Sequence, residues 1–227
     1  MNSKFNLITL LLVITLCSCK KEAKEKTLDE YKFSEKGTVL NCDNFDVKLL
    51  NEALFSFEDD IIKYYGKNNP NYTTARVYNQ FISNVIYNRA KYEEIVSPHT
   101  VKIFEVLKTK ENLWHPNSTT SKLNYNSDLF SCISNNITNT DLNTTLKALV
   151  STNSMSPKLF GPAVQSNYSL SVRDKYLAAY LAFDFFYAKL FNVDVSKVTE
   201  KPEPKVDFNK VPPTVPDATD PHAGHNH

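Results

Sequence analysis

Glycine is scarce in this chain, which contains only four glycines in 227 residues. Tight β-hairpin turns favour glycine because their central residues adopt positive φ angles. The scarcity therefore argues against a hairpin-rich β fold. The glycine-rich GxGxxG and Walker loops that bind dinucleotides and phosphates are also absent from the sequence, which excludes sites built on either motif.

An excess of charge of either sign is lacking as well. The formal net charge is +1, and loss of residues 1–18, whose one charged residue is Lys4, would leave zero. A basic excess would indicate nucleic acid, and an acidic excess would indicate a solvating or calcium-rich surface. We therefore predict no nucleic-acid partner.

The apolar run near the N-terminus, residues 7–16, is too short to span a membrane. A spanning helix needs roughly 20 apolar residues, whereas the apolar region of a secretory signal has roughly 7–15. Lys4 precedes the run and supplies the positive charge expected at the start of such a signal. The segment is therefore typical of an export signal.

The export signal ends in Leu16, Cys17, Ser18 and Cys19. This ending resembles the lipobox of bacterial lipoproteins, with small Ser18 directly before the modified cysteine. The resemblance implies cleavage before Cys19, attachment of lipid to Cys19, and loss of Cys17 with the signal. Several acyl chains give stable anchoring, where one chain alone would be marginal. The alternative is an ordinary secretory signal with incidental cysteines.

The lysines and glutamates that follow Cys19 resemble those of lipoproteins of the Bacteroidota. That resemblance implies a lipid-anchored protein of the cell envelope, most plausibly of the outer membrane. Whether the domain faces the periplasm or the cell surface is left open.

Cysteine is otherwise limited to Cys42 and Cys132. Exported proteins occupy an oxidising space, so an even pair of cysteines is a candidate disulfide. A bond closing a loop of about 90 residues would stabilise the fold by roughly 4–5 kcal/mol if its effect is entropic. The alternative is two buried free thiols.

Apolar residues at helical spacing predict an all-α fold, a single bundle-like domain of about six to seven helices. We expect a signal peptide at 1–18, a charged tether at 19–40, the helical domain at 41–195 and a proline-rich disordered tail at 196–227. The predicted helices cover residues 43–66, 73–94, 97–110, about 129–133, 140–151, 154–164 with an interruption at Gly161 and Pro162, and 171–192.

The last predicted helix is apolar almost all round and contains Asp184, which must be hydrogen-bonded or paired if it is buried. At helical spacing it shares a face with Arg173, Tyr180 and Tyr187. One hypothesis makes these four residues the floor of a ligand pocket between helices. The alternative is a structural polar network or a partly exposed face.

The C-terminal residues His222, His225 and His227 could together bind Zn²⁺, Cu²⁺ or Ni²⁺ weakly. We predict no other cofactor. The alternative is a solvated terminus without a metal role.

Other titratable residues give weaker signals. Glu58, Asp59 and Asp60 are interpreted as a solvated helix face, and His99 and His115 as lone histidines without a partner nearby in sequence. No motif of a serine hydrolase, zinc protease or cysteine nucleophile is present in the sequence.

The leading functional hypothesis is a non-enzymatic binding or accessory lipoprotein of the envelope. Twelve tyrosines and fourteen phenylalanines favour a binding surface for an envelope protein or a glycan, although aromatic core packing is the alternative. The first rival is a metal-handling lipoprotein that uses the C-terminal histidines. The second is an enzyme whose site is assembled from residues dispersed in the sequence.

Overall fold

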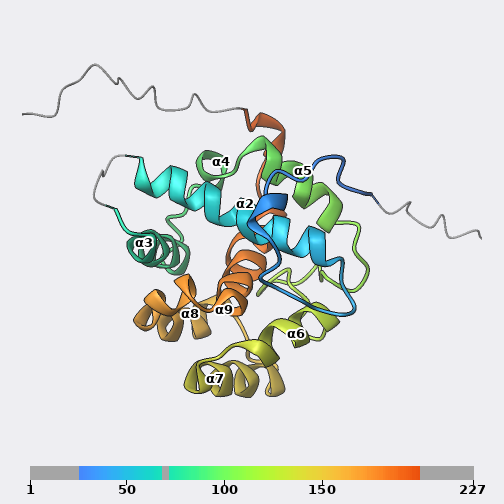
Figure 1. Ribbon diagram of the computed structural model, residues 1–227. Coiled ribbons are helices and arrows are strands. Elements are labelled where there is room, and N and C mark those ends of the chain that lie inside the picture. The colour runs from blue at the N-terminus through green and yellow to red at the C-terminus, as the bar shows by residue number, and fades with distance from the viewer. Residues whose placement is uncertain (1–25, 68–71, 200–227) are drawn as a thin grey trace, which may run out of the picture.

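The computed structural model describes residues 26–67 and 72–199, and these residues form one helical domain (Figure 1). Within these ranges there is no strand, only an isolated antiparallel bridge between Trp114 and Leu123. The predicted all-α class is therefore confirmed. No helix in the described part of the chain is long and apolar enough to cross a membrane.

The described residues form the following helices and helical turns. In chain order they are the 3₁₀ turn η1 (Ser34–Lys36), α2 (Val47–Gly66), α3 (Thr74–Ile86), α4 (Tyr92–Ile95), α5 (Pro98–Leu107), α6 (Asp128–Asn136), α7 (Thr140–Ser151), α8 (Pro157–Ser166), the 3₁₀ segment η2 (Tyr168–Val172), α9 (Lys175–Tyr180), the π-helix η3 (Leu181–Tyr187), α10 (Ala188–Leu190) and the 3₁₀ turn η4 (Val195–Lys197).

The sequence predicts Ser97 and Ser156 as helix caps, and both are confirmed, whereas the first helix is capped by Asp46 and not by Asp43 or Asn44. Ser97 Oγ accepts the backbone N–H of Thr100 before α5, and Ser156 Oγ accepts that of Leu159 before α8. Each serine is followed by proline at the first helical position, where a missing N–H costs nothing. Thr73 caps α3 in the same way.

Several predicted helix boundaries are wrong, among them the start of the first helix, which begins at Val47 and not at residue 43. The second helix does not run to residue 94, because α3 ends at Ile86 and Asn88 adopts a left-handed φ of 52°. The carbonyl of Asn84 accepts the N–H groups of Arg89 and Ala90, which closes that end. Conversely, α8 continues through Pro162. The hydrogen bond that proline cannot donate would fall on the first turn, at exposed Lys158.

The stretch from α9 through η3 to α10 occupies the middle of the molecule (orange in Figure 1). Phe183, Phe185 and Phe186 are fully buried there, as expected for the centre of the bundle. The helix starts later than predicted, because Asp174 caps α9 and leaves Arg173 in the turn before it. Seven residues then form a π-helix, which sequence periodicity does not reveal.

Residues 26–40 are packed on the domain, which corrects the prediction that the charged tether extends to residue 40. Phe33 and Leu40 are buried, and Glu52 accepts the backbone N–H of Phe33 at 3.1 Å. Asn51 Oδ1 accepts the N–H of Leu40 at 3.0 Å, and its Nδ2 donates to the carbonyl of the same residue at 2.8 Å. We call residues 26–40 the N-terminal arm.

Candidate functional site

A buried carboxylate, Asp184, lies near the middle of the π-helix η3 and has no exposed surface. Three hydroxyl groups donate to it: Tyr180 at 2.8 Å, Tyr125 at 3.1 Å to each carboxylate oxygen, and Ser121 through a short bond. Tyr180 belongs to α9, whereas Ser121 and Tyr125 come from the loop between α5 and α6. The loop is therefore fastened to the central helix through one carboxylate.

Burial changes the pKa of the Asp184 carboxyl group. Loss of solvent raises the pKa of Asp184 above its usual range, while the hydrogen bonds from Ser121, Tyr180 and Tyr125 oppose the shift. Burial and the neighbouring carboxylate raise the pKa of both Tyr125 and Tyr180. The two tyrosines consequently remain protonated and act as donors to Asp184.

The four residues predicted to share a ligand pocket do not meet. Tyr180 binds Asp184, but Arg173 is exposed in the turn before α9. The hydroxyl of Tyr187 donates instead to the carbonyl of Ala53 on α2, at 3.0 Å. The physical reason is the backbone: Arg173 precedes the helix, and a π-helix turns less per residue than the α-helix on which the shared face was predicted. Asp184 lies in a buried network of hydrogen bonds with Ser121, Tyr125 and Tyr180.

A cavity of about 180 Å³ lies over the loop side of this network. Ser121 and Tyr125 line it and bind Asp184, so they separate the carboxylate from the surface. The remaining lining residues come from the same loop and from the end of α7: His115, Ser118, Thr120, Leu123, Asn124, Asn126, Val150, Asn153 and Met155. We call this the Ser121 cavity. His115 is exposed at its edge.

The interpretation of Glu58, Asp59 and Asp60 as a solvated face is wrong for two of the three residues. Glu58 and Asp60 are 9% and 2% exposed, and only Asp59 is paired at the surface, with Lys63 at 3.0 Å. The reason is that α2 packs against neighbours on more than one side, so its polar residues meet partners that local sequence does not show.

Each buried carboxylate on α2 has its own partners. Glu58 accepts the Tyr78 hydroxyl at 2.8 Å and pairs with Lys175 at 2.7 Å. Asp60 accepts the N–H of Ser97 at 3.0 Å and the Thr100 hydroxyl at 2.7 Å. Burial raises the pKa of Asp60 to about 6 despite these hydrogen bonds.

His99 is not a lone histidine. Its Nε2 lies 2.6 Å from Oε1 of Glu52, whose carboxylate also accepts the backbone N–H groups of Lys32 and Phe33. The pair therefore fastens the N-terminal arm to α2 and α5. The sequence signal was too weak to find it, because 47 residues separate the partners.

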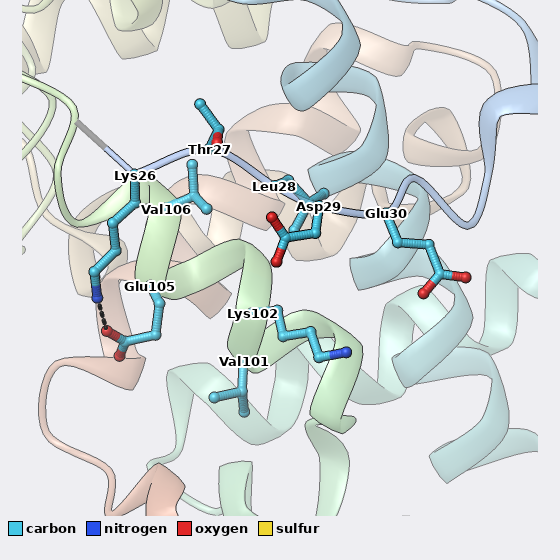
Figure 2. Close-up of a pocket in the computed structure, with 9 residues that line it drawn as sticks. All are labelled: Lys26, Thr27, Leu28, Asp29, Glu30, Val101, Lys102, Glu105 and Val106. Carbon is cyan, nitrogen blue, oxygen red and sulfur yellow. Dashed lines mark hydrogen bonds and ion pairs between the residues drawn. The ribbon is translucent and has the colours of Figure 1, made fainter.

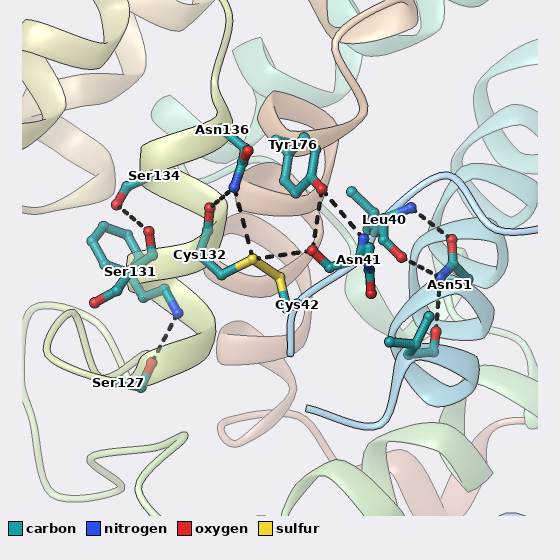
Figure 3. The surroundings of a disulfide bond; sticks show 12 residues. Leu40, Asn41, Cys42, Asn51, Ser127, Ser131, Cys132, Ser134, Asn136 and Tyr176 are labelled. Atoms are coloured by element: carbon teal, nitrogen blue, oxygen red, sulfur yellow. Dashed lines mark hydrogen bonds between the residues drawn. A yellow bond between two sulfur atoms is a disulfide. The ribbon is translucent and has the colours of Figure 1, made fainter. Parts of the chain in front are cut away.

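The predicted disulfide between Cys42 and Cys132 is present and joins the segment before α2 to α6 (Figure 3). The two Cα atoms are 5.8 Å apart, and the bond closes a separation of 90 residues. Next to it, the Tyr176 hydroxyl lies 3.3 Å from both the backbone N and the carbonyl O of Asn41. The start of the helical domain is thus held covalently and by hydrogen bonds.

A larger groove of about 670 Å³ lies between the N-terminal arm and α5 (Figure 2). Leu28, Val101 and Val106 give it an apolar lining, and Lys26 pairs with Glu105 at 3.1 Å at one end. This pair is partly exposed, and exposed ion pairs contribute little to stability. The arm is therefore held more loosely here than at Glu52 and Asn51.

No group of three or more histidine, cysteine, aspartate or glutamate side chains suited to a metal occurs in residues 26–67 and 72–199. The predicted lipid site, Cys19, and the predicted metal ligands His222, His225 and His227 lie outside these residues.

Comparison with known protein families, with curated proteins and with solved structures found no match to this chain.

Proposed function

We propose that this chain is a lipid-anchored protein of the bacterial cell envelope, acylated at Cys19, whose helical domain acts as a binding or accessory protein without enzymatic activity. The outer membrane is the proposed location. The sequence ending at Cys19 supplies the resemblance to lipoproteins.

The observation that carries the proposal is the disulfide between Cys42 and Cys132. Such bonds persist in oxidising compartments and are rare in the bacterial cytosol. A disulfide in the folded domain agrees with an export signal at residues 1–18, and the two features are independent because they lie in different parts of the chain.

The N-terminal arm adds a geometric argument. Residue 26 contacts the domain through Glu105 and Thr109 of the α5 region, and only six residues lie between it and Cys19. Such a segment spans at most about 25 Å when fully extended. An anchor at Cys19 would therefore hold the α5 side of the domain close to the membrane surface.

The anchor is tested by metabolic labelling with a radioactive fatty acid in a bacterium of the Bacteroidota. We expect label in the wild type and in a Cys17→Ala variant, and none in Cys19→Ala. Label that persists in Cys19→Ala would refute the assignment. Separation of inner and outer membranes on a density gradient then tests the proposed location.

The metal-handling alternative depends on His222, His225 and His227, and no observation on the described residues favours it. Deletion of residues 221–227 tests it directly. If cellular zinc, copper and nickel contents are the same with and without the deletion, the alternative is ruled out.

A further inference from the structure

The Ser121 cavity is where the buried Asp184 network comes close to the surface. Ser121 is 7% exposed and Tyr125 is half-buried, and both side chains contact Asp184 on one side and the cavity on the other. Asp184 itself is fixed by the π-helix and by Tyr180 from within the core. π-Helical turns occur frequently at functional sites.

The lining of the Ser121 cavity is polar but carries no aspartate, glutamate, lysine or arginine. A charged ligand would lose solvation there without gaining an ionic partner, which is costly. Hydroxyl and amide groups line it instead, together with three apolar side chains, Leu123, Val150 and Met155. The cavity therefore suits a neutral ligand with both polar and apolar faces.

The hydrogen bonds to Asp184 determine whether the hydroxyl groups of Ser121 and Tyr125 can donate to a ligand or accept from it. Ser121 and Tyr125 donate their hydroxyl hydrogens to the carboxylate, so toward other groups their oxygens act as acceptors. Ser121 Oγ already accepts the backbone N–H of Leu123 at 3.1 Å, which leaves it one lone pair for a ligand. The Asn126 amide, which lines the cavity and is exposed, offers both a donor and an acceptor. Separate ligand hydroxyl groups can donate to Ser121 and Tyr125 and accept from Asn126.

A second depression of about 330 Å³ adjoins the first and shares Tyr125, Asn126 and Val150 with it. Its other lining residues include Ser131, Ser134 and Asn135, which carry hydroxyl and amide groups as well, and Lys147, an exposed lysine at its edge. Hydrogen-bonding groups thus continue past the Ser121 cavity along α6 and α7. That extension suits a ligand built of more than one polar unit.

We propose that the Ser121 cavity and the adjoining depression bind a neutral oligosaccharide, with Ser121 and Tyr125 accepting hydrogen bonds from sugar hydroxyls. Asp184 is a positioning residue that holds both acceptors. The inference deepens the binding role proposed above and rests on it. Its test uses purified protein and is independent of the lipid anchor, so each can fail without the other.

The fluorescence of a tryptophan next to the Ser121 cavity can be used to measure ligand binding. Trp114 is the only tryptophan, and it pairs with Leu123 of the cavity lining in the isolated bridge and directly precedes His115. Its fluorescence should respond to a ligand in the Ser121 cavity. Saturation-transfer NMR on the sugar gives a second readout that does not depend on Trp114.

The experiment titrates the full-length, detergent-solubilised protein with chitobiose, cellobiose and maltose, and separately with sulfate and ethanolamine as charged probes. We expect saturable binding of at least one disaccharide. Val150→Phe, which fills the shared wall of the two depressions, should weaken it at least tenfold. Thr144→Phe, at an exposed position on the same helix that lines neither depression, should not. No disaccharide binding, unchanged affinity in Val150→Phe, or tighter binding of a charged probe would overturn the proposal.

Two tyrosine variants separate ligand contact from structural support. Tyr125→Phe and Tyr180→Phe each remove one hydroxyl from Asp184, but only Tyr125 lines the cavity. We expect about a tenfold loss of disaccharide affinity in Tyr125→Phe, the effect of one hydrogen bond, and a much smaller loss in Tyr180→Phe. Equal losses would mean that Tyr125 acts only through the fold, and would overturn its assigned role.

Discussion

At the scale of single residues, the buried carboxylates are the least expected feature of this domain. Asp184 is surrounded by hydroxyl donors, Glu58 has a lysine and a tyrosine, and Glu52 is shared between His99 and the N-terminal arm. Asp60, like Asp184, has no cation among its hydrogen-bond partners, which are an amide and a hydroxyl. Its ionised form is therefore not compensated by an opposite charge at hydrogen-bond distance.

Asp60 gives a prediction for the pH dependence of stability. Its pKa is raised from 3.8 to about 6 by burial, so its contribution to stability is fully present below pH 4 and is lost as the pH rises through 6. The shift corresponds to about 3 kcal/mol. In Asp60→Asn, which keeps an acceptor for Ser97 and Thr100, this dependence should disappear.

The measurement is the difference in unfolding free energy between wild type and Asp60→Asn, from urea titrations at pH 4, 5, 6 and 7. We expect the variant to gain on the wild type between pH 4 and pH 6, and the difference to level off by pH 7. A difference that stays constant across this range would show that Asp60 does not titrate near pH 6.

Whether the sequence predicts the role of each of these residues depends on how far along the chain its hydrogen-bonding partner lies. The caps Ser97 and Ser156 were predicted because a cap and its N–H group are three residues apart. The burial of Glu58 was missed because Lys175 is 117 residues away. The sequence predicts that a buried Asp184 is hydrogen-bonded or paired and places Arg173, Tyr180 and Tyr187 on its face, but of its actual partners only Tyr180, one turn away, is among them.

At the scale of elements, α8 lies close enough to its neighbours that one of its positions requires glycine. A Cβ atom placed on Gly161 would lie 2.7 Å from Cγ1 of Ile86 on α3 and 3.6 Å from the ring of Phe185 on η3. From the sequence, Gly161 is predicted only as an interruption of the helix. In the fold it permits the close approach of α8 to α3.

Gly161→Ala is therefore expected to destabilise the domain by about 1–3 kcal/mol through overpacking, although alanine favours helices. Gly66→Ala is the matched control, because its new Cβ would meet the ring of Tyr72, which is 40% exposed and can move. Thermal unfolding followed by circular dichroism compares the two. Equal melting temperatures for the two variants would contradict the close packing of α8.

The N-terminal arm is an element that sequence composition did not reveal, since its charged residues resemble a tether. Asn51 compensates for the shortage of apolar residues by bonding the backbone of Val39 and Leu40. We expect Asn51→Ala to raise the hydrogen-exchange rates of these two amides by at least tenfold, because each loses its acceptor. The amide of Val101 on α5 serves as the internal control. Unchanged exchange at Leu40 would mean that the arm is held without Asn51.

At the scale of the whole molecule, the disulfide between Cys42 and Cys132 contributes to the free energy of unfolding. Removing it should cost about 2–5 kcal/mol because the loop it closes is long. Wild type treated with reductant and the double variant Cys42→Ser, Cys132→Ser should then show the same lowered stability in urea. Reductant should have no effect on the double variant. A wild type that is insensitive to reductant would contradict the bond.

The fold class was predictable at this scale because helical periodicity and cap residues are local signals. The π-helix and the order of the arm were not, because both result from packing between distant segments. The candidate site could be predicted from the sequence only in part. Asp184 was identified from the sequence, whereas the loop at residues 115–126 that completes the Ser121 cavity has no periodicity that predicts its position.

The position of the disulfide also has a mechanical consequence. If the chain is anchored at Cys19, a force that pulls the domain away from the membrane acts first on the N-terminal arm. Residues 26–41 can detach from the domain until the load reaches Cys42, and when fully extended they span roughly 55 Å. At Cys42 the disulfide transmits the force to Cys132 on α6. The force then bypasses α2, which lies within the loop that the disulfide closes. The N-terminal arm would extend under load, and the disulfide would limit that extension before the helical core unfolds.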